Sequence, residues 1–165
     1  MTVWRMNLKD DRSIKDCNAD KELKFRICLE KSILAIGWGL NATFDNWTEY
    51  KKFADWHYQD DIGYHTAVKY LKKMKRGDLV WIKNPVTDER YLAQIVDDVP
   101  SLCSYLKEFD MYSYRKANIF SITSDLFNKF DIPFGSKYKR RSHTIEQVNK
   151  QPIVDETIKV FDSIK

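Results

Sequence analysis

Trp38 lies between Gly37 and Gly39 in the apolar run ILAIGWGL at residues 33–40. Glycine is a poor strand residue, and it lets a ligand approach the backbone closely. A large aromatic face beside an open backbone therefore predicts one wall of a pocket for a flat ligand. A glycine bulge at the rim of a small barrel is the alternative. Trp81, in the run GDLVWIK, has strand spacing and is expected in the core.

The three histidines predict no catalytic site. His57 and His65 are eight residues apart, which is not a metal-ligand spacing, and His143 lies in the basic segment RRSHT. A single histidine among arginines is more typical of a phosphate contact than of general acid–base catalysis. A ribonuclease-like site built from His143, Lys139 and Tyr138 is the enzymatic alternative. The sequence contains no glycine-rich phosphate loop, no GxSxG motif and no zinc motif.

The composition is typical of one soluble globular domain. The chain has 165 residues, of which 43% are apolar and 32% are charged. Its longest apolar run is too short to cross a bilayer, and the start MTVWRMNLKDD turns charged at once, so no signal peptide is expected. Cys17, Cys28 and Cys103 are widely spaced and odd in number, which favours buried reduced thiols over disulfides or zinc. We expect a cytoplasmic protein.

The positive charge is concentrated in two segments. The net charge is +4, and the segments 69–76 and 137–141 carry five and four positive side chains, with tyrosines between them. A lysine-rich helix face is often only solvated, but two such clusters favour an anionic polymer as the partner. The aromatic share of 14% is more than a small core needs, so some rings are expected to be exposed or to line a pocket.

Hydrophobic periodicity predicts a mixture of strands and helices in one domain. We expect strands over 2–8, 32–40, 78–84, 90–98 and 112–122. We expect helices near 19–30 and over 47–56, 62–75 and 154–164. Another helix is expected to begin within 142–148, with Ser142 or Thr144 as its N-cap. A loop is expected over 131–142. The predicted fold class is α+β, a small mixed barrel of five or six strands with helices packed outside. A single domain spans 1–165, with 149–165 as a C-terminal helical extension.

Four segments carry a family resemblance. They are VWRMNL with Trp4, ILAIGWG with Trp38, KRGDLVWIKN with its return strand RYLAQI, and the basic RRSHTI before the last helix. In this order and spacing they resemble the EVE branch of the PUA-like superfamily, whose relatives include the YTH domains. The resemblance covers residues 2 to about 148, but the charged segment 9–31 matches no family motif.

The resemblance implies a PUA-like barrel and a non-catalytic reader of DNA or RNA. EVE and YTH domains hold one flipped, often methylated, base in an aromatic pocket at the barrel mouth. Several EVE-like domains occur in modification-dependent restriction systems, fused to nucleases or standing alone, so a nuclease partner is also implied. No cofactor, metal or membrane partner is expected.

The expected site residues form two groups. The base-binding group is Trp38, Trp47 and Trp56 as stacking walls, Gly37 and Gly39 beside them, and Asn7 and Asn84 at the base edge. The phosphate-binding group is Lys83, Arg140, Arg141, Ser142 and Thr144. Alternatively, Trp47 staples the start of its helix and Trp56 belongs to the core. A protein-binding adaptor or inhibitor without a nucleic-acid role is the remaining functional alternative.

Overall fold

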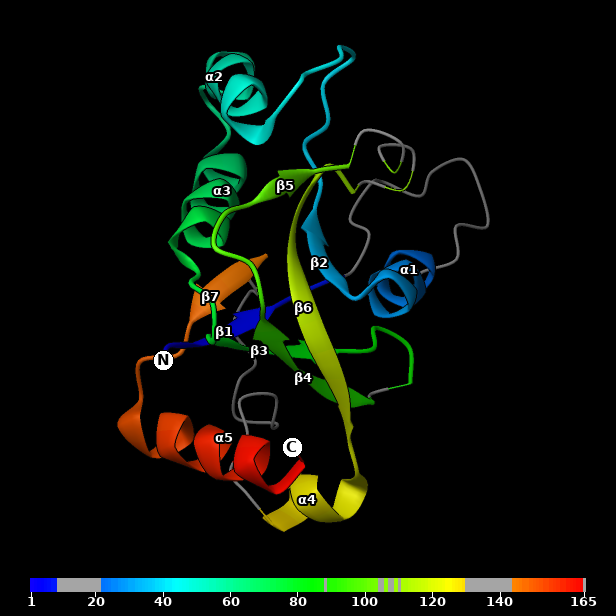
Figure 1. Cartoon of the computed structure of the whole chain (residues 1–165), viewed down its shortest axis with the longest axis vertical. Helices are drawn as coiled ribbons and strands as arrows, with labels where there is room; N and C mark the ends of the chain where they lie inside the picture. The colour runs from blue at the N-terminus through cyan, green and yellow to red at the C-terminus, as the bar shows by residue number, and fades with distance from the viewer. Residues whose placement is uncertain are drawn as a thin grey trace.

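A curled β-sheet forms the centre of the computed structural model, and helices surround it (Figure 1). The structure describes residues 1–8, 22–87, 89–103, 106, 109, 111–129 and 144–164. The strands are β1 (Val3–Met6), β2 (Ile33–Ile36), β3 (Leu79–Lys83), β4 (Arg90–Ile95), β5 (Ser101–Leu102), β6 (Ser113–Ile122) and β7 (Ile145–Gln147). The helices are α1 (Leu23–Lys31), α2 (Trp47–His57), α3 (Ile62–Lys73), α4 (Ser124–Lys129) and α5 (Gln151–Ile164).

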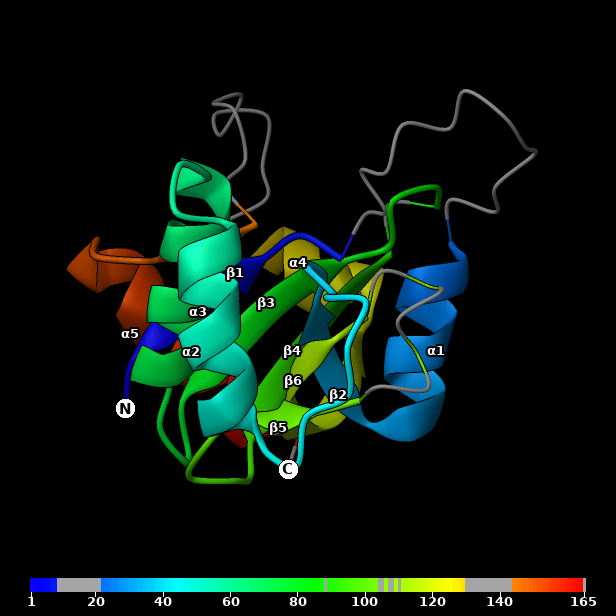
Figure 2. The same ribbon diagram turned by 90° about the horizontal axis from the view of Figure 1, so that it is seen from above.

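The strands pair in the order β2-β6-β4-β3-β1-β7, and β5 pairs with β6. Only β1 and β3 are parallel among the described pairs, because the chain between them crosses over through α1, β2, α2 and α3. The sheet curls into a half-barrel between α2 and α3 on one side and α1 on the other (Figure 2). The α+β class and the barrel-like shape agree with the sequence prediction. The described sheet has seven strands, one more than the upper bound expected.

The two faces of the sheet bury two separate clusters, because side chains alternate along a strand. In β3, Val80 and Ile82 point into the main core, while Leu79 and Trp81 join a second cluster that includes Val160 and Phe161 of α5. The predicted core position of Trp81 is confirmed, since its exposed fraction is 0%.

A hydrogen bond also joins this tryptophan to α5. The indole Nε1 of Trp81 donates to Oγ1 of Thr157 over 2.9 Å, and that hydroxyl donates to the carbonyl oxygen of Ile153 over 2.7 Å. The second cluster therefore attaches the C-terminal helix to the sheet through both apolar and polar contacts.

The predicted helix at 142–148 is wrong. Residues 145–147 form β7, which pairs antiparallel with β1 in the register Trp4↔Gln147 and Met6↔Ile145. Two backbone bonds extend the pairing: Asn7 N–H donates to the Thr144 carbonyl, and Val148 N–H donates to the Val3 carbonyl, each over 2.9 Å. A free strand edge satisfies the backbone polar groups of this segment, which outweighs the local capping signal.

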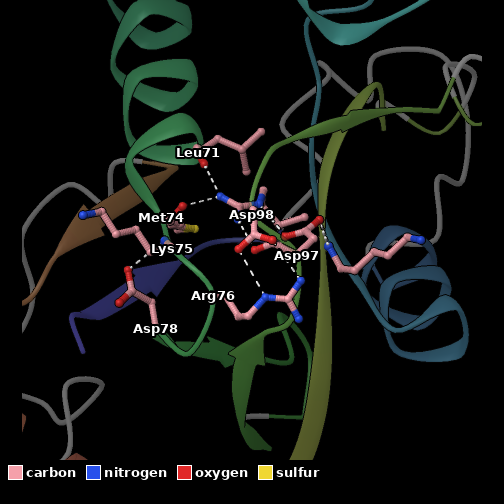
Figure 3. Close-up of polar contacts among 9 residues, drawn as sticks. Leu71, Met74, Lys75, Arg76, Asp78, Asp97 and Asp98 are labelled. Carbon is pink, nitrogen blue, oxygen red and sulfur yellow. Dashed lines mark hydrogen bonds and ion pairs between the residues drawn. The ribbon is translucent and has the colours of Figure 1, made fainter.

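Arg115 of β6 joins the C-terminal end of α3 to the sheet, and Figure 3 labels its partners Leu71, Met74 and Asp97. Its side chain is fully buried, and its Nη1 donates to the carbonyl oxygens of Leu71 and Met74 over 2.9 and 2.5 Å. Its Nε lies 2.7 Å from Oδ1 of Asp97, and Nη2 donates to the Asp97 carbonyl oxygen. The guanidinium thus meets the negative end of the helix dipole and a carboxylate at once.

Asp78 fixes the start of β3 against β1. This buried carboxylate accepts hydrogen bonds from the indole Nε1 of Trp4 over 2.9 Å and from the backbone N–H groups of Thr2 and Lys75. Trp4 is 1% exposed, so it is a core residue whose polar edge is satisfied.

The described cysteines agree with the prediction of reduced thiols. Cys28 and Cys103 are both buried and free, whereas Cys17 lies outside the described residues. Burial raises the pKa of the Cys28 thiol to about 11. In the described part of the chain, no helix has both the length and the apolar character needed to span a bilayer.

Candidate functional site

The segment after β2 turns away from the sheet at Trp38. The strand predicted over 32–40 ends at Ile36, because Trp38 has a φ of +62°, in the left-handed region that non-glycine residues rarely adopt. Its indole Nε1 donates to Oδ2 of Asp61 over 2.8 Å, and its ring meets the edge of Tyr64 at a centroid distance of 6.2 Å. Tertiary contacts therefore hold this strained residue in place.

Three tyrosine hydroxyls hold the same segment against the sheet and α2. Tyr50 and Tyr58 donate to the carbonyl oxygens of Trp38 and Gly39, each over 2.6 Å, and Tyr112 donates to that of Ala42 over 3.2 Å. Burial raises the pKa of Tyr50 and that of Tyr112, so both hydroxyls stay protonated and able to donate near neutral pH. These bonds hold the segment in place, and it forms a wall of the site.

A surface cavity of about 610 Å³ lies between this wall and α2, and we call it the aromatic cavity. It is lined by Gly39, Leu40, Asn41, Ala42, Thr43, Phe44, Glu49, Phe53, Trp56 and His57. Trp56 is 74% exposed and Phe53 is 51% exposed, which is unusual for such large apolar side chains. The rings of Phe44 and Phe53 contact each other at 5.6 Å, so a ligand would lie across their outer faces and against Trp56.

Two side-chain hydrogen bonds close the first turn of α2, as in a capping box, except that Glu49 reaches the residue before the N-cap Asn46. Asn46 Oδ1 accepts from the Glu49 N–H over 2.9 Å, and Glu49 Oε2 accepts from the Asp45 N–H over 2.8 Å. This arrangement holds the Glu49 carboxylate in one place on the cavity wall.

The structure brings some of the predicted base-binding residues together and separates others. Trp56 and Gly39 line the aromatic cavity, whereas Trp38 is half-buried and is not a lining residue. Trp47 is half-buried against the main core, with its indole Nε1 donating to Oγ of Ser113 over 3.2 Å. Gly37 is buried. Of the predicted stacking tryptophans and their neighbouring glycines, only Trp56 and Gly39 therefore line the cavity.

The two asparagines lie away from α2, in parts of the chain with their own contacts. Asn84 is buried, and its Oδ1 accepts from the N–H groups of Val86 and Thr87 in the β3–β4 turn. This is an Asx turn, a local structural role. Asn7 is half-buried next to β1, and its backbone N–H bonds to Thr144.

The predicted phosphate-binding residues are only partly described. Lys83 ends β3 and is half-buried, and Thr144 is half-buried beside β7. Arg140, Arg141 and Ser142 lie outside the described residues, as do Tyr138, Lys139 and His143 of the nuclease alternative. Within the described part of the chain, no three His, Cys, Asp or Glu side chains gather as metal ligands would.

Sequence reasoning missed Phe44 and Glu49 and did not place Phe53 in the site. The spacing of the aromatic residues in α2 does indicate which of its faces is exposed. Trp56 follows Trp47 by nine residues, about two and a half turns at 3.6 residues per turn, so the two tryptophans lie on opposite sides of α2. Since Tyr50 and Ala54 are the buried residues of α2, the face with Phe53 and Trp56 is the exposed one.

Comparisons with known proteins do not place the chain in a family. No protein-family model matches it, and no curated protein matches it. A crystal structure of protein Atu2648 from Agrobacterium tumefaciens aligns with 97% of this chain and 93% of its own, at 10% sequence identity and a TM-score of 0.40. The class that the fold and site define is a mixed α+β protein with a curled sheet and an exposed aromatic cavity.

Proposed function

We propose that this protein is a non-catalytic nucleic-acid-binding module that holds one unstacked base in the aromatic cavity. The observation that carries the proposal is the pair of exposed rings, Phe53 and Trp56, on the wall of a cavity of about 610 Å³. Cavities of roughly 300–1,000 Å³ are typical of small-ligand sites. Removing a base from its stack costs a few kcal/mol, which stacking on an aromatic face can offset.

Lysines on the next helix offer contacts for the phosphates. Lys69, Lys72 and Lys75 are exposed on and just after α3, which follows α2 through a short turn. Their ammonium groups have no partner among the described residues, whereas Lys73 donates to Gln147 and Arg76 pairs with Asp98. The three free ammonium groups can thus neutralise a phosphate backbone.

We also propose that the fold is PUA-like. The curled sheet with helices outside is compatible with a PUA-like barrel, and the resemblance to EVE domains suggests that the base is methylated. In that case the partner is DNA or RNA, in a restriction or defence context with a nuclease nearby.

Replacing Trp56 with alanine is the direct test. We expect Trp56→Ala to weaken binding of a short single-stranded oligonucleotide about 5- to 150-fold, because one stacked base contributes about 1–3 kcal/mol. Fluorescence anisotropy of an end-labelled oligonucleotide measures the affinities, because this signal does not depend on Trp56. In the parent, Trp56 is the most exposed tryptophan described, and a stacked base should quench its own fluorescence. Ile62→Ala, an exposed residue outside the cavity lining, is the control and should bind as the parent does. Equal affinities for Trp56→Ala and the parent would refute the proposal.

The lysines make a second prediction. The triple variant Lys69→Gln, Lys72→Gln, Lys75→Gln should bind the oligonucleotide more weakly. The slope of its log association constant against log salt concentration should be less negative by about 2. Each phosphate contact to a single strand contributes a slope of about −0.7. Titrations at several salt concentrations check it, and an unchanged slope would place the phosphates elsewhere on the protein.

A protein-binding adaptor is the second candidate, favoured by the exposed patch of Phe53, Trp56 and Ile62 around the α2–α3 turn. Ile62 is 82% exposed. An adaptor would lose its partner equally in Trp56→Ala and Ile62→Ala, and it would show no salt-dependent binding of oligonucleotides. The same two variants therefore separate the two candidates.

A further inference from the structure

One face of α2 presents a carboxylate and two aromatic rings to the same cavity. Glu49, Phe53 and Trp56 follow one another at spacings of four and three residues, which places neighbouring side chains about one turn apart on one helix face. The capping bond to the Asp45 N–H fixes the Glu49 carboxylate there. A group that lies on the outer faces of these rings is therefore close to a fixed negative charge.

The stretch of chain that forms the cavity carries more acidic than basic side chains. Between residues 39 and 61 the chain carries five carboxylates, Asp45, Glu49, Asp55, Asp60 and Asp61, against two lysines, Lys51 and Lys52. Lys51 is paired with Asp55, and neither lysine lines the cavity, whose only basic side chain is His57. Glu49, the acidic residue among the lining residues, thus favours a cation at the rings over a phosphate.

Aromatic faces bind cations because the ring quadrupole is negative above and below the plane. A neutral methylated base gains only stacking and methyl burial from these rings. Adenine methylated at N1 and cytosine methylated at N3 are positively charged near neutral pH, because these ring nitrogens bear no hydrogen in the neutral base. Such a base gains cation–π attraction and the Coulomb attraction of Glu49 as well.

We infer that the aromatic cavity selects a nucleobase carrying a positive charge, such as adenine methylated at N1 or cytosine methylated at N3, and that Glu49 provides the charge discrimination. This inference rests on the proposed function, and it names the ligand class of the same site. The lysines of α3 do not line the cavity, so in this inference they contact the phosphates and not the base.

Isomeric bases test the charge without changing the composition of the ligand. 1-Methyladenine is cationic near neutral pH, and its isomer N6-methyladenine is neutral; 3-methylcytosine and 5-methylcytosine form a second such pair. Each base is placed at the centre of the same single-stranded oligonucleotide and titrated against the full chain by tryptophan fluorescence. We expect the cationic isomer of each pair to bind about tenfold more tightly.

Glu49→Gln keeps an acceptor for the Asp45 N–H but removes the negative charge. The preference for the cationic isomer should therefore fall from about tenfold to about two- to threefold. Only the affinity for the cationic isomer should change. Glu30→Gln is the matched control, because Glu30 is exposed on α1, which lies across the sheet from α2 (Figure 2). It should leave the preference unchanged.

The outcomes separate this inference from the proposed function. Equal or tighter binding of the neutral isomers would overturn the inference and leave the base-binding function standing. Binding of no oligonucleotide would overturn both. A full cationic preference in Glu49→Gln would overturn the role of Glu49.

Discussion

Arg115→Met is expected to lower the free energy of unfolding by about 3–5 kcal/mol, the usual cost of removing one partner of a buried ion pair. Methionine preserves much of the apolar volume but leaves the Asp97 carboxylate without its cation. The carbonyl oxygens of Leu71 and Met74 also lose their donor. Urea denaturation monitored by circular dichroism measures the change.

An exposed pair beside it provides the control (Figure 3). Arg76 and Asp98 form a bidentate pair at 3.0 and 3.2 Å, but their side chains are 62% and 72% exposed. Solvent screens such a pair, so Arg76→Met should change the free energy of unfolding by less than about 1 kcal/mol. If both variants lost a similar amount of unfolding free energy, burial would not explain the contribution of Arg115 to stability.

Trp81→Ala is expected to cost about 3–5 kcal/mol of unfolding free energy, as large-to-small substitutions of buried aromatic residues do. The substitution empties the centre of the cluster between β3 and α5 and removes the bond from the indole to Thr157. Because this cluster is what joins α5 to the sheet, the helix should also become easier to cleave by proteases. Denaturation and limited proteolysis measure the two effects.

Trp56→Ala is the matched control, since it removes the same side chain from an exposed position. Its free energy of unfolding should lie within about 0.5 kcal/mol of the parent value, as is usual for surface substitutions. A large loss of stability there would show that Trp56 supports the fold, and its effect on binding could no longer be assigned to stacking.

Most of the secondary structure could be predicted from local patterns. Alternating apolar residues around the turn PVTDE predict the hairpin of β3 and β4, and Asn46 and Asp61 cap α2 and α3 through their side chains. These signals are local, because each depends on residues a few positions apart.

The strand β7 and the end of β2 could not be predicted in this way. Segment 145–147 becomes a strand because β1 offers it an unpaired edge, and the pairing residues are about 140 positions away in sequence. The strand at β2 stops before Trp38 because Asp61 and three tyrosines hold the following segment in another conformation.

The sequence alone determined that this is an α+β chain with many aromatic residues, since hydrophobic periodicity identifies strands and helices and the composition shows a surplus of aromatic rings. Only the tertiary structure decided which tryptophan faces solvent. Trp81 and Trp4 are buried by strands and helices distant in sequence, Trp38 is held by Asp61, and Trp56 stays exposed because Tyr50 and Ala54 occupy the buried face of α2. The role of each ring depends on what packs against it, which no local pattern contains.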